Sequence, residues 1–236
     1  MNDNNMEENI SDNLAMTVAE TGSLELPAEI LEFSIDQVID EGILKDIPFV
    51  GWIAKGFSMC RSISDRMFHH KILRFLIALE KTGEGDRESF RKKIKDDKSF
   101  KRKVGEHLLL LIDKIDAFEK ASILARCFDH FLTGDIDYDY FVDLSHVIER
   151  TPLSDLKALS VHDNKRILFG SVGVAVACGI LEFAIAEPET GEELPSLGTK
   201  ISKHGQDLRD MLLDRFRERL AKEKEHQRQF LKQFEI

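Results

Sequence analysis

The chain has 236 residues, of which 42% are hydrophobic and 32% charged, with a formal net charge of −10. This length and composition suit one large or two small globular domains, and they weigh against a collagen-like, low-complexity or β-sandwich chain. Residues 1–47 and 111–199 are acidic, whereas residues 51–110 and 200–236 are basic. An acidic arm beside a basic segment can shield that segment from nucleic acid or acidic lipid, or it can simply keep the protein soluble.

The cysteines are odd in number, widely spaced and set in apolar surroundings: Cys60, Cys127 and Cys178. Such a set argues against a disulfide framework and indicates a reducing compartment. The chain starts with neither a basic segment nor a hydrophobic run, so we expect neither a secretory signal nor a transit peptide. We therefore expect a cytoplasmic protein, with membrane association as the alternative.

Residues 1–24 are polar and poor in large apolar side chains, which predicts a disordered acidic arm. Over residues 27–42, helical spacing of apolar residues predicts a short amphipathic helix. Residues 48–83 continue this spacing, with a proline suited to a first helical turn and a glycine suited to a C-cap. We expect one helix of about 30 residues here, roughly 45 Å long, as the centre of a helical bundle over residues 25–136.

The next segment is strongly basic and contains Arg91, Lys92, Lys93, Lys95, Lys98, Lys101, Arg102 and Lys103. Basic residues interleaved with aromatic ones can bind phosphates and stack bases, so this basic cluster is a candidate phosphate- or lipid-binding site. The alternative is a solvated helix face. Asp96 and Asp97 interrupt the run, and Phe90, Ile94 and Phe100 have the spacing of a buried stripe.

Residues 108–115 form a further buried face, and Asp116 and Glu119 then have the spacing of a capping box that opens another helix. That helix has apolar residues at intervals of three and four, and Gly134 is its expected end. The short turn between these helices predicts antiparallel or sharply bent neighbours within the bundle.

The acidic turn that follows resembles the middle of a calcium-binding loop. In the register set by its glycine, Phe131 takes the third ligand position and Tyr140 the twelfth, where an EF-hand needs oxygen ligands. This pattern excludes an EF-hand. We expect Ile136 to enter the core and Asp137 to cap the next helix.

The sequence contains none of the strong enzyme motifs: no Walker loop, GxGxxG, nucleophile elbow or HExxH. The weaker candidates are His69 with His70, Cys127 with His130, and His146 with Glu149. Each pair lacks the further ligands that a metal or catalytic site needs. We expect no catalytic residue, no metal site and no cofactor, and an enzyme of unrecognised type is the third functional alternative.

In the C-terminal third, two helices are expected first, the second capped by Thr151 or Ser154. The sequence VAVACGILEFAIAEPETGEELPSLGTKISKHGQDLRDML then resembles the end of a winged-helix module. The matching order is a helix that stops at Gly179, a strand from Ile180, a polar hairpin, and a return strand into a closing helix. The resemblance covers roughly residues 138–215 and rests on this order of elements.

A winged-helix module implies either DNA binding through the helix before the wing or a role in protein interaction. Here that helix would have the sequence GSVGVAVAC, with no Arg, Asn or Gln to read base edges. The resemblance therefore favours protein interaction over DNA reading.

Residues 167–186 have a rival interpretation, because they contain one charge and match the length of a membrane span. The charge, Glu182, and the strand-like segment ILEFAI favour a buried core element instead. On a strand, Glu182 would face water while Leu181 and Phe183 face inward.

The expected fold class is mainly α: a helical bundle around a long helix, a winged-helix-like α+β module over residues 137–215, and a charged C-terminal helix over 216–236. In that last helix, Phe230, Leu231 and Phe234 are the candidate residues for docking on a partner.

We expect a non-enzymatic regulatory or interaction protein that binds another macromolecule. A protein is the favoured partner, and nucleic acid is an alternative through the basic cluster. The competing hypothesis is a membrane-acting effector that uses residues 49–57 or 167–186. Fold-level analogy adds a bacterial mobile-element or phage-defence context.

Overall fold

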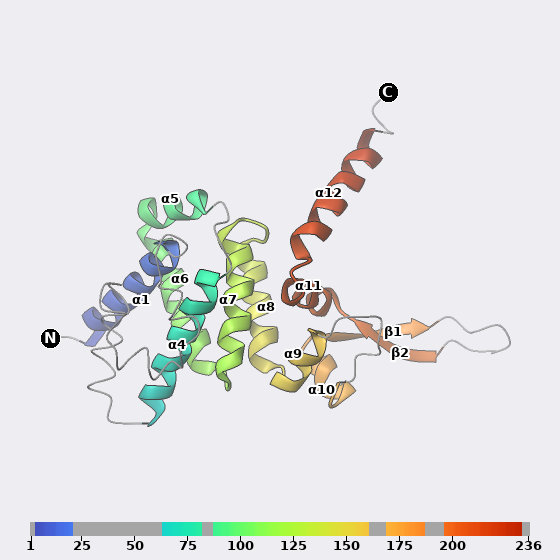
Figure 1. Cartoon of the computed structure of the whole chain (residues 1–236), viewed down its shortest axis with the longest axis horizontal. Coiled ribbons are helices and arrows are strands. Elements are labelled where there is room, and N and C mark those ends of the chain that lie inside the picture. Colours follow the sequence, from blue (N-terminus) through green and yellow to red (C-terminus); the bar gives the residue numbers. More distant parts are fainter. Residues whose placement is uncertain (1–2, 21–62, 82–86, 161–168, 187–195, 233–236) are drawn as a thin grey trace. The chain divides into compact units, whose positions relative to one another are not determined.

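The computed structural model describes residues 3–20, 63–81, 87–160, 169–186 and 196–232. The chain divides into two compact units, Met1–Glu149 and Arg150–Ile236. The described part is mainly helical, with a small antiparallel sheet of two strands (Figure 1). The division falls near the end of the helix that follows residue 136, whereas the boundary predicted from the sequence lies before that helix.

The first unit contains α1 (Asp3–Glu20), α4 (Ile63–Lys81), α5 (Glu88–Asp96), α6 (Lys98–Lys114), α7 (Phe118–Leu132) and α8 (Tyr138–Arg150). α4 packs along α7, and α1 packs along α6 and against α5. α4 is the described part of the long helix predicted over residues 48–83. Residues 48–62, and the short helix predicted over 27–42, lie outside the described residues.

Phenylalanine rings from four helices meet in the core of this unit. The ring of Phe128 on α7 lies 5.7 Å from Phe75, 6.2 Å from Phe90 and 5.2 Å from Phe141, measured between centroids. All these pairs are tilted or edge-to-face, the arrangements that the charge distribution of aromatic rings favours. Spacing of three and four along each helix therefore forms the helical stripes and also brings the rings together.

α1 is the main departure from the sequence prediction, which made residues 1–24 a disordered arm. Leu14, Ala15 and Val18 of α1 are completely buried. Gly105 of α6 permits the contact, because a Cβ at that position would lie 2.0 Å from the carbonyl oxygen of Ser11. The segment is polar in composition, and a few apolar residues on one face are enough to dock it against a glycine.

Cations from other helices cap three helix C-termini of the first unit. The bonds, each 2.9 Å long, run from Arg91 Nε to Ala19 O, from Lys71 Nζ to Asp113 O, and from Lys120 Nζ to Glu149 O. The last carbonyls of a helix lack partners within the helix and carry partial negative charge. These cations therefore fix helix ends through contacts between segments far apart in the sequence.

The predicted capping box of Asp116 and Glu119 is wrong. The N-cap of α7 is Ala117, which makes no side-chain capping bond. The helix begins too late for Asp116 to cap it, and the Asp116 carboxylate instead lies 2.7 Å from Lys120 Nζ.

The turn between α7 and α8 follows the prediction. Gly134 has a φ of 75° and terminates the α7 segment. Ile136 is buried. The Asp137 carboxylate accepts a hydrogen bond of 2.8 Å from the Tyr140 N–H, which caps α8.

The second unit contains α9 (Leu153–Leu159), α10 (Val172–Ala177), β1 (Leu181–Ala186), β2 (Ser196–Ile201), α11 (Lys203–Leu212) and α12 (Phe216–Lys232). β1 and β2 are antiparallel, with Leu181 opposite Ile201 and Ala186 opposite Ser196. Gly179, with a φ of 88°, ends the helical segment before β1. The predicted order of helix, strand, strand and helix is confirmed.

The predicted cap of α9 is wrong. Its N-cap is Pro152 with no side-chain bond, rather than Thr151 or Ser154. The proline ring fixes φ and holds the chain in a suitable entry conformation without a side-chain bond.

The closing helix of the second unit and the charged C-terminal helix are separate, and α12 begins at residue 216, the start predicted from the sequence. Asp214 has a φ of 56°, which interrupts the helical conformation between α11 and α12. Arg219 of α12 then forms ion pairs with the buried Asp207 and Asp210 of α11. These pairs fix the start of α12 against α11.

Candidate functional site

Two members of the basic cluster have structural roles against α1. Arg91 caps the C-terminus of α1, and Lys101 pairs with Asp12 of α1 at 2.7 Å. The segment that the sequence predicts to be a disordered acidic arm therefore forms a helix, α1, and this helix binds two cations of the basic cluster.

Two further members lie over aromatic rings. Lys93 Nζ is 3.9 Å from the centroid of the Phe100 ring, and Lys103 Nζ is 4.4 Å from that of Tyr138. A cation over a ring face is attracted by its negative electrostatic potential, and at exposed sites this contributes about 0.5–1 kcal/mol. Both lysines remain exposed to solvent.

Lys92, Lys95 and Lys98 are exposed, and none forms an ion pair or side-chain hydrogen bond within the described residues. We define these three lysines as the basic corner, because α5 ends and α6 begins between them, at Asp97. Arg102, also exposed, lies about one turn further along α6.

Lys98 occupies a position that helix stability disfavours. It is the first residue of α6, where the partial positive charge of the helix dipole repels a cation by about 0.3–1 kcal/mol. Asp97 offsets part of this cost, since its carboxylate caps the helix through the Phe100 N–H at 2.9 Å. Residues that contradict a local preference in this way are typical of functional positions.

The aromatic residues of the basic cluster belong to the core. Phe90 is 5% exposed and Ile94 is 1% exposed, which confirms the predicted buried stripe at these positions. Phe100 is half-buried, with its ring 6.3 Å from that of Phe90 and with Lys93 above it. The basic corner therefore offers ammonium groups without an exposed ring beside them.

The β1–β2 ribbon is the second notable surface. Alternate residues of β1 share one face, and along that face Leu181 is 7% exposed, Phe183 64% and Ile185 76%. The prediction that Phe183 faces inward is therefore wrong. The alternation is as expected, but the core of the second unit covers this face at Leu181 and leaves Phe183 uncovered.

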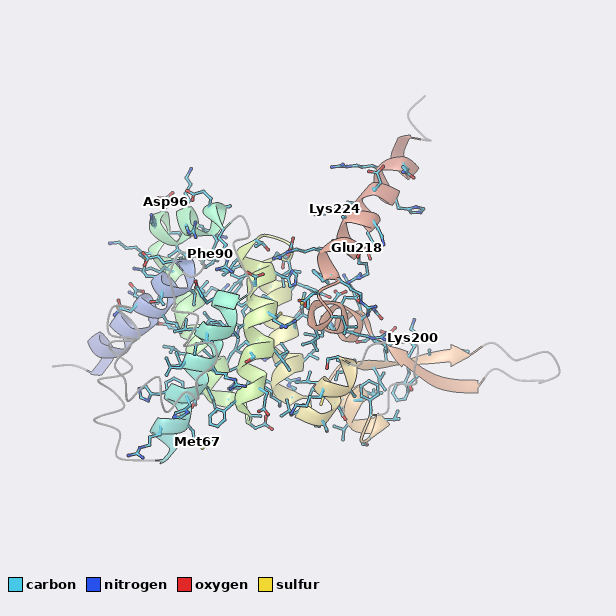
Figure 2. The ribbon with its side chains drawn as sticks, viewed as in Figure 1. Met67, Phe90, Asp96, Lys200, Glu218 and Lys224 are labelled. Carbon is cyan, nitrogen blue, oxygen red and sulfur yellow. The ribbon has the colours of Figure 1, made fainter. Side chains whose placement is uncertain are left out.

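The opposite face of the ribbon is polar. Lys200 lies on β2 (Figure 2). Its direct cross-strand neighbour is Glu182 of β1, and their charged groups are 3.1 Å apart. The ribbon is thus amphipathic, and its apolar face is exposed at Phe183 and Ile185 as its polar face is at Glu182 and Lys200.

The remaining predicted interaction residues are outside the described part. The backbone of α12 reaches Lys232, but the side chains of Phe230 and Leu231 and the whole of Phe234 are not described. Residues 49–57 are likewise outside it. These docking candidates stay predictions.

A titratable cluster lies at the edge of the aromatic core. His107 Nδ1 is 3.0 Å from the Tyr138 hydroxyl oxygen, and the His107 ring centroid is 6.3 Å from that of His146. Burial, then the charges of His146, Lys103 and Lys114, lowers the pKa of His107 below its ordinary value of 6.5. Burial raises the pKa of Tyr138. Both groups are therefore neutral at pH 7, and their contact stabilises packing.

The other pairs noted in the sequence have ordinary structural contacts. Cys127 is buried, and His130 Nδ1 lies 2.9 Å from a carboxylate oxygen of Asp135. His146 Nδ1 lies 3.6 Å from Glu149. In the part of the chain that the structure describes, no group of three or more His, Cys, Asp and Glu side chains is placed to hold a metal ion.

None of the helices described is both long enough and apolar enough to cross a membrane. Within the candidate span 167–186, the described residues form the short helix α10 and the strand β1. Comparison with known proteins gave no match among family models, curated proteins or solved structures. The basic corner and the apolar face of the ribbon are the candidate functional surfaces.

Proposed function

We propose that the protein acts by binding a protein partner, and that the second unit is a winged-helix-like module whose wing, the β1–β2 ribbon, is the binding element. The observation that carries the proposal is the exposure of Phe183 and Ile185, 64% and 76%, on one face of the ribbon. Single exposed apolar residues are normal, but adjacent ones on a narrow ribbon are typical of a surface that is buried on binding.

The sequence of α10 supports a protein partner rather than DNA. α10 reads VGVAVA and precedes the ribbon, in the place where a DNA-binding winged helix has its reading helix. It contains no side chain that could donate to or accept from a base edge. In such a winged-helix-like module the wing is available for binding, but the helix before it cannot read DNA bases.

The size of the apolar face favours a partner that encloses the ribbon. Complete burial of a phenylalanine removes about 150–250 Å² from water. A standard interface needs about 800 Å² per partner, so two flat ribbon faces pressed together would fall short. A groove that holds both the ribbon face and its edges would supply the remaining area.

Charge indicates the character of that groove. The connection between the strands, residues 187–195, contains four glutamates and no basic residue. A partner with an apolar groove and a basic rim would complement the ribbon, whereas an anionic lipid surface would repel it.

Photo-crosslinking from the two faces of β1 tests the proposal. A photoreactive residue replaces Ile185 in one variant and Glu182, on the opposite face, in the matched control. In cells that express the full chain, Ile185 should give one discrete protein adduct and Glu182 much less of it. Equal labelling from both faces, adducts to lipid, or an adduct of two copies of this chain would each contradict the proposal.

The captured partner then permits a quantitative test. Phe183→Ser with Ile185→Thr should weaken binding of the purified partner by about tenfold or more, because each removes a buried apolar anchor. Thermal melting should change little, since both side chains are exposed in the unbound chain.

A further inference from the structure

We infer that the basic corner, Lys92, Lys95 and Lys98, contacts the phosphate backbone of double-stranded nucleic acid without reading its sequence. This inference concerns the first unit and a separate surface, so it does not depend on the role proposed for the ribbon.

The fold separates the corner from the cations that stabilise the unit. Arg91 and Lys101 are held by α1, and Lys93 and Lys103 lie over rings. The three lysines of the corner have no such contact in the described residues, and Lys98 opposes the dipole of its own helix. The dipole of α5 favours a cation at Lys95, in its last turn, whereas neither helix stability nor packing explains a lysine at position 98.

A polyanion is the ligand that this charge pattern fits. Lysine ammonium groups bind phosphate as compact point charges, and neutralising phosphates releases condensed counterions. The chain as a whole is acidic, but at about 0.1 M salt the Debye length is only about 10 Å, so distant carboxylates repel little. The exposed Glu88 and Asp96 beside the corner predict weak binding that salt readily reverses.

Two absences near the corner favour a duplex over other polyanions. Proteins that hold single strands stack bases on exposed aromatic rings, whereas Phe90 is buried and Phe100 lies under Lys93. Surfaces that bind anionic membranes usually add apolar side chains that enter the lipid. From residue 88 to residue 103, no large apolar side chain is exposed.

The same segment explains why no sequence preference is expected. Residues 88–103 contain no asparagine or glutamine, the residues that pair with adenine, and the corner itself consists of lysines. Contacts from flexible lysines to phosphate fix position and carry no sequence information directly.

The test uses the full chain and a fluorescent mixed-sequence DNA duplex, with anisotropy followed as salt rises from about 50 to 200 mM. The variant carries Lys92→Gln, Lys95→Gln and Lys98→Gln. The control carries Lys157→Gln, Lys203→Gln and Lys224→Gln, which are exposed lysines of the second unit and change the net charge equally. Circular dichroism melting checks that both variants fold.

The corner variant should bind the duplex at least tenfold more weakly at the lowest salt. Its plot of log affinity against log salt should also flatten by about 0.9 for each phosphate that the variant no longer neutralises. The control should match the wild type. Equal effects of both triple variants, or no duplex binding by the wild type at low salt, would overturn the inference.

Two further arms identify other ligands. Single-stranded DNA bound as tightly as the duplex would overturn the duplex assignment. Vesicles of phosphatidylcholine with phosphatidylserine, bound where the duplex is not, would replace nucleic acid with lipid. The ribbon variant Phe183→Ser with Ile185→Thr should bind the duplex like the wild type, which separates this inference from the proposed function.

Discussion

Phenylalanine is used in opposite ways in the two units. In the first, Phe128 is fully buried among the rings of Phe75, Phe90 and Phe141. In the second, Phe183 is 64% exposed on a ribbon whose other face carries the ion pair of Glu182 and Lys200. Burial makes the first ring a source of folding stability, whereas the second contributes little to folding and leaves its apolar surface exposed.

The largest effect should come from removing the central ring. Phe128→Ala should lower the free energy of unfolding by about 3–5 kcal/mol, because it removes a buried ring and leaves a cavity between helices. The matched variant Phe183→Ala should change it by no more than about 0.5 kcal/mol. Urea unfolding of both variants measures the difference.

Comparable decreases in stability for the two variants would break the contrast between the units. They would mean that the ribbon face is covered within the chain, and the proposed binding role of Phe183 would lose its basis.

A smaller effect should follow from crowding the contact between α1 and α6. Gly105→Ala places a methyl group against the Ser11 carbonyl and should cost about 1–3 kcal/mol, because neither backbone can move without disturbing its helix. α1 should then be cut more readily by protease.

Gly173→Ala is the control for that substitution. Gly173 is an exposed helical glycine, and the nearest neighbour of a Cβ at this position would lie 3.9 Å away. Alanine there should therefore be neutral or stabilising by up to about 1 kcal/mol. If Gly105→Ala is equally harmless, α1 does not pack on α6, and the prediction of a disordered arm over residues 1–24 would be correct.

Local patterns in the sequence correctly predicted features that depend on neighbouring residues, such as which face of a helix is buried and where a helix ends. Helical spacing predicted the burial of Phe75, and the glycine at 179 marked the end of a helical segment. Strand alternation correctly placed Leu181 and Phe183 on one face. It could not show that only Leu181 is covered, since cover depends on which elements pack above the strand.

The errors at the candidate site have the same origin. The sequence showed eight cations close together, but the role of Arg91 depends on Ala19, and that of Lys101 depends on Asp12. Both partners lie in a segment whose composition indicated disorder. Its docking depends on Gly105, far away in the sequence, and no local pattern connects them.

The smallest effect concerns the polar margin of the aromatic core, where His107 lies beside Tyr138. Burial and nearby positive charge lower the pKa of His107 in the folded chain, so between its ordinary value and the lowered one the unfolded chain binds more protons. The folded state is therefore favoured fully above about pH 6.5, and that contribution is lost as the pH falls below it. His107→Gln should cost about 0.5–1.5 kcal/mol at pH 7.5, through the contact with Tyr138.

Because glutamine does not titrate, the variant should also lose less stability than the wild type as the pH falls from 7.5 to 5.5, measured by urea unfolding. His226→Gln, at an exposed position of α12, is the matched control and should leave the stability at pH 7.5 unchanged. A pH dependence that persists in His107→Gln would assign it to other groups. In that case the protonation of His107 would not be coupled to folding, and His107 would behave as a solvated residue rather than as part of the aromatic core of the first unit.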